Sequence, residues 1–394
     1  MDNPPAAHWD FDAVIDRRAA PFPDSLKWNR YADRDVIPLW VADMDFAAPP
    51  AIIEALRQRV AHGVFGYGQP WPALVDTVRD YLDRRYQWPV EAEWLVWLPG
   101  LVTGLNVACR TVDGDVVTAT PVYPPFLSAP VLSGRHLATV PLARCDDRWA
   151  WDFDALAAAL EPTTRLLLLC HPHNPVGRAW NDQELQSVAD LAERHDLIVC
   201  SDEIHCDLVL GPRRHRPFAM LGKEASRRSI TLMAPSKTFN IPGLGCAFAV
   251  IPDQGLRHDF QRAMSGIVPH VNTLGLVACE AALRDCADWH AALIEYLRGN
   301  RDRVAAAVAA MPGLRLAPVE ATYLAWIDAT ETGLDEPRRF FEAAGVGLSG
   351  GADFGPNDDY RQFVRLNFGC PRTTLSTALE RMRTALGKRL DRTG

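Results

Sequence analysis

Short apolar runs alternate with helical stretches from about residue 50 to residue 285, and this alternation leaves few folds open to the chain. Six runs are predicted strands, at 94–100, 115–121, 165–172, 196–203, 229–235 and 246–251. They are continuously apolar rather than alternating, which is typical of strands that are covered on both faces. We therefore predict an α/β domain in which helices cover a mostly parallel sheet.

The segment between two of these runs begins like a helix. Asn181 is a good N-cap, and Glu184 follows three residues later, which is the spacing of a capping box. Apolar residues then recur at helical intervals. We predict a helix over residues 181–195.

The pattern changes after about residue 287. A long helix is predicted at 288–311, followed by short strands within 314–318, 322–328 and 363–368. A chain of 394 residues is also too long for one simple core. We expect a large domain at 50–287 and a smaller α+β domain at 288–394, which the N-terminal segment 1–49 joins.

Composition and charge exclude several classes of partner. The net charge is −8 and no dense Lys/Arg run occurs, so neither nucleic acid nor an anionic membrane is expected as a partner. No apolar run approaches the roughly 20 residues that span a bilayer, and the N-terminus lacks a signal-peptide pattern. Nine scattered cysteines form no CxxC pair, which predicts free thiols and a cytoplasmic location. The histidines and cysteines at 171–173 and 205–206 match no zinc spacing, so no metal is predicted.

Polar residues at four predicted strand ends are the candidates for chemistry, because ligands collect at the carboxyl ends of strands in α/β sheets. After Gly100 a helix is expected to start near Val102, and free amides at such a start suit a phosphate. Asn174 precedes a proline, Asp202 follows an apolar run, and Lys237 lies in a short polar insert between two apolar runs. Each also has an ordinary explanation: a glycine turn, a proline turn, a helix cap or salt bridge, and a surface charge.

Together these features favour one cofactor. Pyridoxal 5′-phosphate (PLP) needs a phosphate site, an acidic partner for its pyridinium nitrogen and a lysine for its aldehyde. A partly buried lysine has a lowered pKa and becomes nucleophilic. Lys237, Asp202 and Asn174 follow consecutive predicted strands, so we expect them at one edge of the sheet.

Nine short motifs, in order along the chain, point to a known family. They are "DSLKW" (24–28), "PLWVADMDF" (38–46), "FGYG" (65–68), "TPVYPPF" (120–126), "HNPVGRAW" (173–180), "SDEIHCDL" (201–208), "SKTFNIPGL" (236–244), "GVGLSGGADFG" (345–355) and "RLNFGCPR" (365–372). With these motifs the chain resembles fold-type I PLP enzymes of the aminotransferase class I/II superfamily, and within them the MalY/PatB group of cystathionine β-lyases (cysteine-S-conjugate β-lyases). The resemblance covers about residues 24 to 385 and implies a homodimer with shared active sites.

The resemblance also implies roles for residues around the cofactor. Lys237 would form the internal aldimine and move the Cα proton, and Asp202 would keep the pyridine nitrogen protonated. Asn174 would hydrogen-bond the ring oxygen, with His205 nearby. Tyr123 would stack on the cofactor ring; the alternative is a core tyrosine beside a Pro-Pro turn.

Further residues are implied for the phosphate and the substrate. The phosphate would be held by the amides of Val102 and Thr103 and the hydroxyl of Ser236. The substrate would be held by Arg365, Trp40 and Tyr67. The planar fork of Arg365 suits an α-carboxylate, although an arginine there is also explained as a surface strand residue. Tyr67 would reach across the dimer interface into the neighbouring site.

The implied reaction is that of a PLP-dependent C–S β-lyase. It would cleave cystathionine or another cysteine S-conjugate to a thiol, pyruvate and ammonia through aldimine, quinonoid and aminoacrylate intermediates. The alternatives are an aminotransferase or decarboxylating enzyme on the same scaffold, in secondary metabolism for example, and a PLP-binding regulator with little catalysis. Elimination is favoured because dicarboxylate aminotransferases usually carry Tyr where His205 stands, and Arg where this chain has Gly245.

The chain departs from the group at several positions. Asn29, His171 and Pro242 replace more usual residues, and segment 348–351 differs from more frequent versions. Departures near the substrate entrance leave the identity of the leaving thiol open, and they leave room for a specialised substrate such as a bulky cysteine conjugate.

Overall fold

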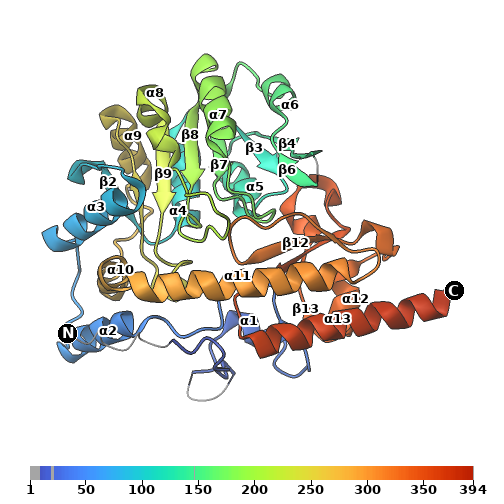
Figure 1. Ribbon diagram of the computed structural model, residues 1–394. Helices are drawn as coiled ribbons and strands as arrows, with labels where there is room; N and C mark the ends of the chain where they lie inside the picture. The colour runs from blue at the N-terminus through green and yellow to red at the C-terminus, as the bar shows by residue number, and fades with distance from the viewer. Residues whose placement is uncertain (1–8, 19–21, 146, 394) are drawn as a thin grey trace.

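A seven-stranded sheet forms the centre of the computed structural model, which describes residues 9–18, 22–145 and 147–393 (Figure 1). The strand order is β2-β10-β9-β8-β7-β3-β4. The strands are β2 (Leu95–Leu98), β3 (Asp115–Thr120), β4 (Leu137–Pro141), β7 (Thr164–Cys170), β8 (Ile198–Asp202), β9 (Ser229–Met233) and β10 (Ala247–Val250). Only β10 runs antiparallel to its neighbours. The six predicted strands and the mostly parallel α/β sheet are confirmed.

The edge strand β4 has no counterpart among the predicted strands. It pairs with β3 alone, most of its residues are partly exposed, and it ends in a proline. A strand at the edge of a sheet does not need an apolar run on both faces, so the pattern that marks the central strands is missing.

The central strands are buried on both faces. Along β7, Leu168 belongs to a core shared with α4 (Leu101–Thr111), whereas Leu167 belongs to a core shared with α7 (Asp182–Arg194). Successive side chains of a strand point to opposite faces, so helices must cover both sides of the sheet. Figure 1 shows this layered arrangement.

The helix α7 begins as predicted. The Asn181 side chain accepts a hydrogen bond from the backbone N of Glu184 at 2.9 Å, and the Glu184 carboxylate accepts one from the backbone N of Asn181 at 2.8 Å. Both bonds of the capping box are therefore present.

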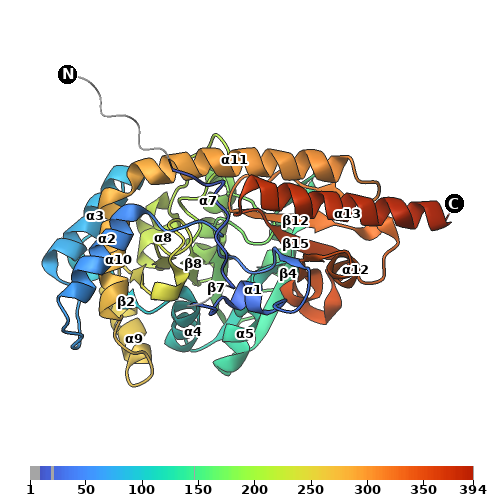
Figure 2. The same cartoon turned by 90° about the horizontal axis from the view of Figure 1, so that it is seen from below.

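A four-stranded antiparallel sheet lies beside the main sheet, in the order β11-β12-β15-β14. Its strands are β11 (Arg315–Leu316), β12 (Leu324–Asp328), β14 (Ser349–Gly350) and β15 (Phe363–Asn367). The predicted long helix is α11 (Ala287–Ala309), which runs beside α13 (Arg372–Thr393) (Figures 1 and 2). Further helices are α1 (Leu26–Asn29), α2 (Pro50–Ala61), α3 (Pro72–Tyr86), α5 (Pro125–Leu132), α6 (Phe153–Ala158), α8 (Lys223–Arg227), α9 (Gln254–Met264), α10 (Thr273–Asp285) and α12 (Pro337–Ala343).

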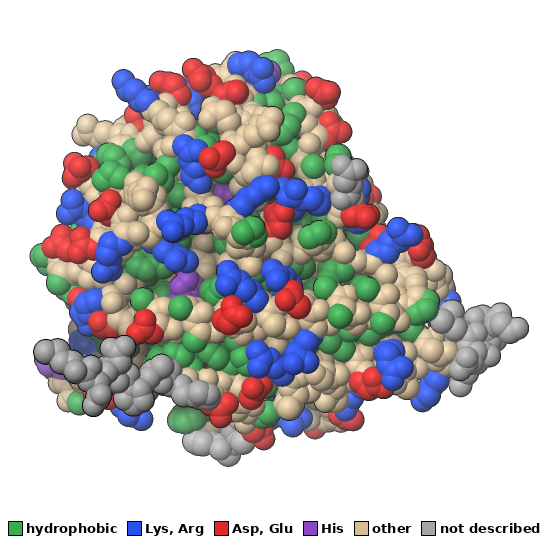
Figure 3. All heavy atoms as spheres, in the orientation of Figure 1, with side chains coloured by type: hydrophobic (Ala, Val, Ile, Leu, Met, Phe, Trp, Pro, Cys, Tyr) green, Lys and Arg blue, Asp and Glu red, His purple; other side chains and the backbone are tan. Residues whose placement is uncertain are grey.

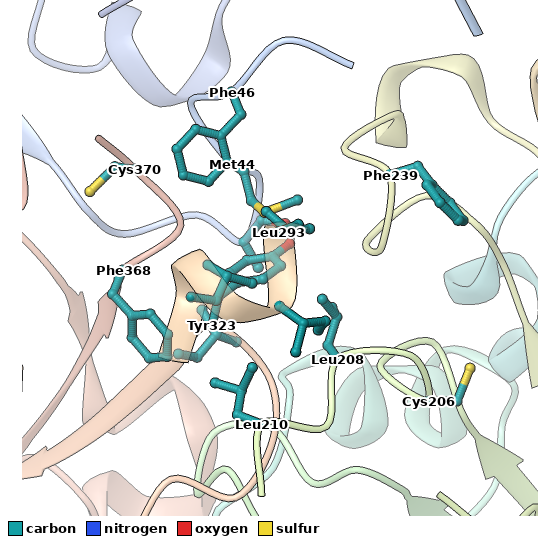
Figure 4. Packing of buried hydrophobic residues seen from close by; sticks show 14 of the residues in the cluster. Met44, Phe46, Cys206, Leu208, Leu210, Phe239, Leu293, Tyr323, Phe368 and Cys370 are labelled. Carbon is teal, nitrogen blue, oxygen red and sulfur yellow. Dashed lines mark hydrogen bonds between the residues drawn. The ribbon is translucent and has the colours of Figure 1, made fainter. Parts of the chain in front are cut away.

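The N-terminal segment is attached to the C-terminal part of the chain. Strand β1 (Ile37–Pro38) pairs in parallel with β13 (Val346–Gly347). A hydrophobic core then joins segments that are distant in sequence; Figure 4 labels Met44, Phe46, Cys206, Leu208, Leu210, Phe239, Leu293, Tyr323, Phe368 and Cys370. The limits of the two expected domains stay a prediction.

A buried ion pair connects two of the motifs. Lys27 is fully buried, and its Nζ lies 2.7 Å from the Asp45 carboxylate. Arg17 also pairs with Asp45 at 2.9 Å, and the Trp28 indole donates a hydrogen bond to it at 2.9 Å. Segments 24–28 and 38–46 thus fix the N-terminal segment in place, which is a structural role.

The described residues contain no disulfide, no helix long and apolar enough to cross a membrane, and no group of three or more side chains arranged to hold a metal. All nine cysteines are free thiols; eight are buried and Cys145 is exposed. The prediction of free cysteines is confirmed.

Candidate active site

A cavity of about 230 Å³ lies where β7, β8 and β9 end. Its lining is Ala42, Gly100, Leu101, Val102, Thr103, Tyr123, Cys170, Asn174, Asp202, Ile204, His205, Ser236, Lys237 and Pro242. Eight of the eleven predicted site residues are therefore together in one place. The exceptions are Arg365, Trp40 and Tyr67.

The amine of Lys237 lies in this cavity, in the turn that follows β9. Its Nζ donates a hydrogen bond to the backbone oxygen of Ala42. Burial lowers the pKa of the Lys237 amine to about 8; the Asp43 carboxylate opposes this shift and the Arg365 guanidinium adds to it. The amine therefore loses its proton easily, as a nucleophile or a base must.

The carboxylate of Asp202 lies at the end of β8 and is 5% exposed. It accepts a hydrogen bond from the backbone N of Ile204 at 3.1 Å, and no described residue forms an ion pair with it. Burial raises the pKa of Asp202 to about 7, with a further increase from Glu203. A protonated pyridine nitrogen would supply the cationic partner that this buried acid lacks.

The start of α4 forms another wall of the cavity. Gly100 precedes the helix, no side chain caps it, and Val102 and Thr103 lie in its first turn. The first amides of a helix have no acceptor within the helix. A Cβ added to Gly100 would meet no protein atom within 4 Å, so the space at this helix start is open. With the hydroxyl of Ser236, these donors fit a phosphate group.

Arg365 of β15 connects the smaller sheet to the cavity. Its Nη1 donates to Oδ1 of Asn174 at 3.0 Å, and its Nη2 donates to the backbone oxygen of Trp40 at 2.8 Å and to Ser349 Oγ at 3.3 Å. Phe354 packs against the guanidinium, 4.9 Å from the ring centre. Burial lowers the pKa of Arg365 to about 10, so it stays charged at neutral pH. Its Nε has no partner in the described chain, which leaves a donor for a carboxylate.

Two rings complete the cavity. The backbone N of Tyr123 donates to the backbone oxygen of Asn174 at 3.0 Å, which ties the two turns together. His205 packs edge-on against Tyr323 at 6.1 Å between ring centres. Burial, with Lys237, lowers the pKa of His205 to about 3, so the ring is neutral. Its Nδ1 is buried without a partner among the described residues.

Two predicted residues lie apart from the cavity. Tyr67 is in the segment between α2 and α3, is fully exposed and does not line the cavity, so its role at a site stays a prediction. The Trp40 side chain donates to the backbone oxygen of Lys27 at 3.1 Å and stacks with Arg30, whose guanidinium lies 4.6 Å from the ring centre. Trp40 contacts Arg365 through its backbone oxygen, and substrate binding by its side chain stays a prediction.

Three residues that no motif singled out also contribute to the site: Ala42, Tyr323 and Ser349. The backbone oxygen of Ala42 accepts hydrogen bonds from Lys237 and, at 3.0 Å, from Tyr323. Ser349 donates to the backbone oxygen of Trp40 at 2.7 Å beside Arg365. Ser349 lies in segment 348–351, which differs from the more frequent versions in the family, but this difference does not predict the contact.

Comparison with known proteins assigns the family. A family model described as aminotransferase class I and II matches residues 34–382. The chain belongs to this family. Among its relatives, cystathionine beta-lyase PatB from Bacillus subtilis (strain 168) is 38% identical in sequence. The match covers 92% of this chain and 96% of that protein.

Solved structures of similar proteins extend the comparison. The crystal structure of OvoB is 49% identical, with a TM-score of 0.92, and the match covers 96% of this chain and 99% of that one. Cystalysin from Treponema denticola, whose structure contains a pyridoxal 5′-phosphate cofactor, is 32% identical with a TM-score of 0.91, covering 97% and 100%. The expected fold, an α/β PLP fold of type I, is confirmed.

The residues that line the cavity have the chemistry that PLP requires. Lys237 supplies an amine of lowered pKa, Asp202 supplies an unpaired buried acid, and the uncapped start of α4 supplies amides for a phosphate. These are the three groups that PLP requires of a protein.

Proposed function

We propose that this chain is a PLP-dependent carbon–sulfur β-lyase. It would cleave cystathionine or another cysteine S-conjugate with water to a thiol, pyruvate and ammonia. One observation carries the proposal: the amine of Lys237 and the unpaired acid of Asp202 share a small cavity with an uncapped helix start. Likeness to PatB, which is named a cystathionine beta-lyase, favours elimination over the other outcomes of such a site.

The roles of the residues follow from their positions. When bound, PLP supplies an electron sink for the electron pair left after a proton leaves the substrate's α carbon. Lys237 would hold the cofactor through Nζ, and its amine would remove that proton as a general base. Asp202 would keep a proton on the ring nitrogen of the cofactor. Tyr123 would support the cofactor ring. The neutral imidazole of His205 would lie beside the same ring.

The other cofactor and substrate contacts are divided between the two sheets. Asn174 would donate to the ring oxygen from the main sheet, and Val102, Thr103 and Ser236 would hold the phosphate. Arg365, from the smaller sheet, would bind the α-carboxylate of the substrate. A carboxylate held there would fix the amino acid in the cavity that contains the amine of Lys237, the general base.

The position eight residues after Lys237 also favours elimination over dicarboxylate transamination. It is Gly245, where dicarboxylate aminotransferases usually carry an arginine. Without that arginine, the cofactor phosphate would depend on the amides of Val102 and Thr103 and on the hydroxyl of Ser236.

We also propose a homodimer with shared sites. Tyr67 is fully exposed, and so in large part are Val64 and Phe65 of the same segment. Large apolar side chains gathered on one exposed segment are typical of a surface that a partner covers. In such a dimer Tyr67 would enter the neighbouring cavity. The free cysteines favour a reducing compartment, the cytoplasm, as the location of the protein.

The deciding experiment is a panel of S-substituted cysteines and cystathionine, with thiol and pyruvate measured in the same reaction. Equimolar thiol and pyruvate without an added keto acid is the expected result. Amino transfer that depends on a keto acid and releases no thiol would instead identify an aminotransferase. A PLP chromophore without turnover of any sulfur amino acid would identify a binding protein.

A further inference from the structure

A second cavity lies away from the candidate active site. Its volume is about 590 Å³, and it is bounded by α3, by the first half of α11 and by the loop that follows β8. None of its lining residues also lines the cavity of Lys237. A molecule in this second cavity is therefore not the substrate.

Arginines surround the mouth of this cavity. Arg84, Arg213 and Arg214 are exposed, and Arg85 and Arg298 complete the basic lining. On the face shown in Figure 3, several Lys and Arg side chains gather near the middle, with some Asp and Glu side chains among them. This concentration of basic charge contrasts with the net charge of the chain, which is −8.

Carboxylates balance only part of this charge. Arg85 pairs with Asp207 at 3.0 Å, and Arg298 lies 3.4 Å from Glu295. Arg84 uses its Nε on the backbone oxygen of Asp80 at 3.2 Å. Of the five arginines that line this cavity, three have no carboxylate partner among the described residues: Arg84, Arg213 and Arg214.

The base of the same cavity is apolar and buried. It is lined by Cys206, Phe239, Leu283 and Ile294. Burial lowers the pKa of the adjacent His215 to about 3, so this ring adds no positive charge at neutral pH. The cavity thus has a basic mouth and a mainly apolar base, in which burial keeps the polar side chains of Tyr86, His215 and His290 neutral by raising the pKa of Tyr86 and lowering the pKa of each histidine.

We infer that this cavity binds a phosphorylated organic molecule of about nucleotide size. Its apolar body would cover the base, and its phosphates would pair with Arg84, Arg213 and Arg214. Guanidinium groups match phosphate oxygens in charge and in geometry. The volume lies within the range of about 300–1,000 Å³ that is usual for small-molecule sites. An inorganic phosphate would leave the apolar base uncovered, and a neutral body would leave three guanidinium groups without an anion.

The test is isothermal titration of the PLP-loaded protein with ATP as the probe, at about 0.15 M ionic strength. We expect ATP to bind with a Kd below about 1 mM and adenosine to give no measurable heat. Absence of ATP binding, or adenosine binding as tightly as ATP, would overturn the proposal.

Two double variants with the same loss of charge localise the site. Arg213→Gln with Arg214→Gln removes two exposed guanidinium groups of the mouth, and we expect at least a roughly tenfold weaker ATP affinity. Arg339→Gln with Arg383→Gln removes two exposed arginines elsewhere and should leave the affinity unchanged. Equal affinities of the two variants would contradict the assignment. Cofactor absorbance and circular dichroism of each variant verify that it is folded.

Discussion

Arg365 and Asn174 are joined by a hydrogen bond across the two sheets, from Nη1 to Oδ1 at 3.0 Å, although 191 residues separate them in the chain. Because the amide oxygen of Asn174 is occupied, its Nδ2 is the atom left to face the cavity. An N–H donor suits the ring oxygen of the proposed cofactor. The residue proposed to bind the substrate thus also orients a residue proposed to bind the cofactor.

The first prediction concerns this bond. Arg365→Lys keeps the positive charge but loses the planar fork that reaches Asn174 and Trp40 together. We expect kcat/KM for an S-substituted cysteine to fall about 100-fold, chiefly through KM, because a charge-assisted bidentate contact is lost. Steady-state kinetics measure the split. A fall in kcat alone would show that Arg365 does not bind the substrate carboxylate.

Lys237→Ala should abolish the covalent attachment of PLP and its absorption band. Thiol release should fall about 1,000-fold or more, because a general base is removed. The matched control is Lys223→Ala, which removes an exposed lysine of α8. Full activity of the Lys237 variant would refute the assignment of the lysine.

Asp202→Asn should stabilise the cofactor-free protein at neutral pH. Burial raises the pKa of Asp202 from 3.8 to about 7, so between these values the folded state holds a proton that the unfolded state has lost. The stability of the parent protein therefore falls as pH rises through this window, and the cost then stays constant. The variant has no such cost, so its advantage should grow from near zero at about pH 4 to roughly 4 kcal/mol above pH 7. Urea unfolding at several pH values measures the difference, and an advantage independent of pH would contradict it.

Tyr67→Ala and Lys237→Ala subunits should complement each other. If Tyr67 acts in the neighbouring site, a mixed dimer has one site with both defects and one intact site. Random mixing of equal amounts should then restore about a quarter of the parent activity. If Tyr67 acts within its own chain, every site has one defect and the mixture stays inactive.

Lys27→Ala should destabilise the fold. Its amine is fully buried against Asp45, so the variant removes a buried ion pair and leaves a space where the side chain packed, while Arg17 and Trp28 still contact Asp45. We expect a loss of about 2–4 kcal/mol in the free energy of unfolding, measured with urea. Lys388→Ala, at an exposed position of α13, is the control and should change it by less than about 0.5 kcal/mol.

The sequence by itself determined the features that depend on near neighbours. Continuous apolar runs identified the five interior strands and the edge strand β2, because a strand that is buried on both faces is apolar at consecutive residues. The capping box of α7 likewise needs only Asn181 and Glu184. Since Lys237, Asp202 and Asn174 follow consecutive strands, a parallel sheet had to bring them to one edge.

Only the tertiary structure decided the contacts between segments that no local pattern relates. The backbone oxygen of Ala42 reaches Lys237, and Arg365 reaches Asn174, because the N-terminal segment and the smaller sheet pack against the end of the main sheet. A backbone acceptor carries no residue type that a motif could reveal. The pKa values of Lys237 and Asp202 also depend on burial by distant residues, so the same side chains in the unfolded chain would have ordinary chemistry.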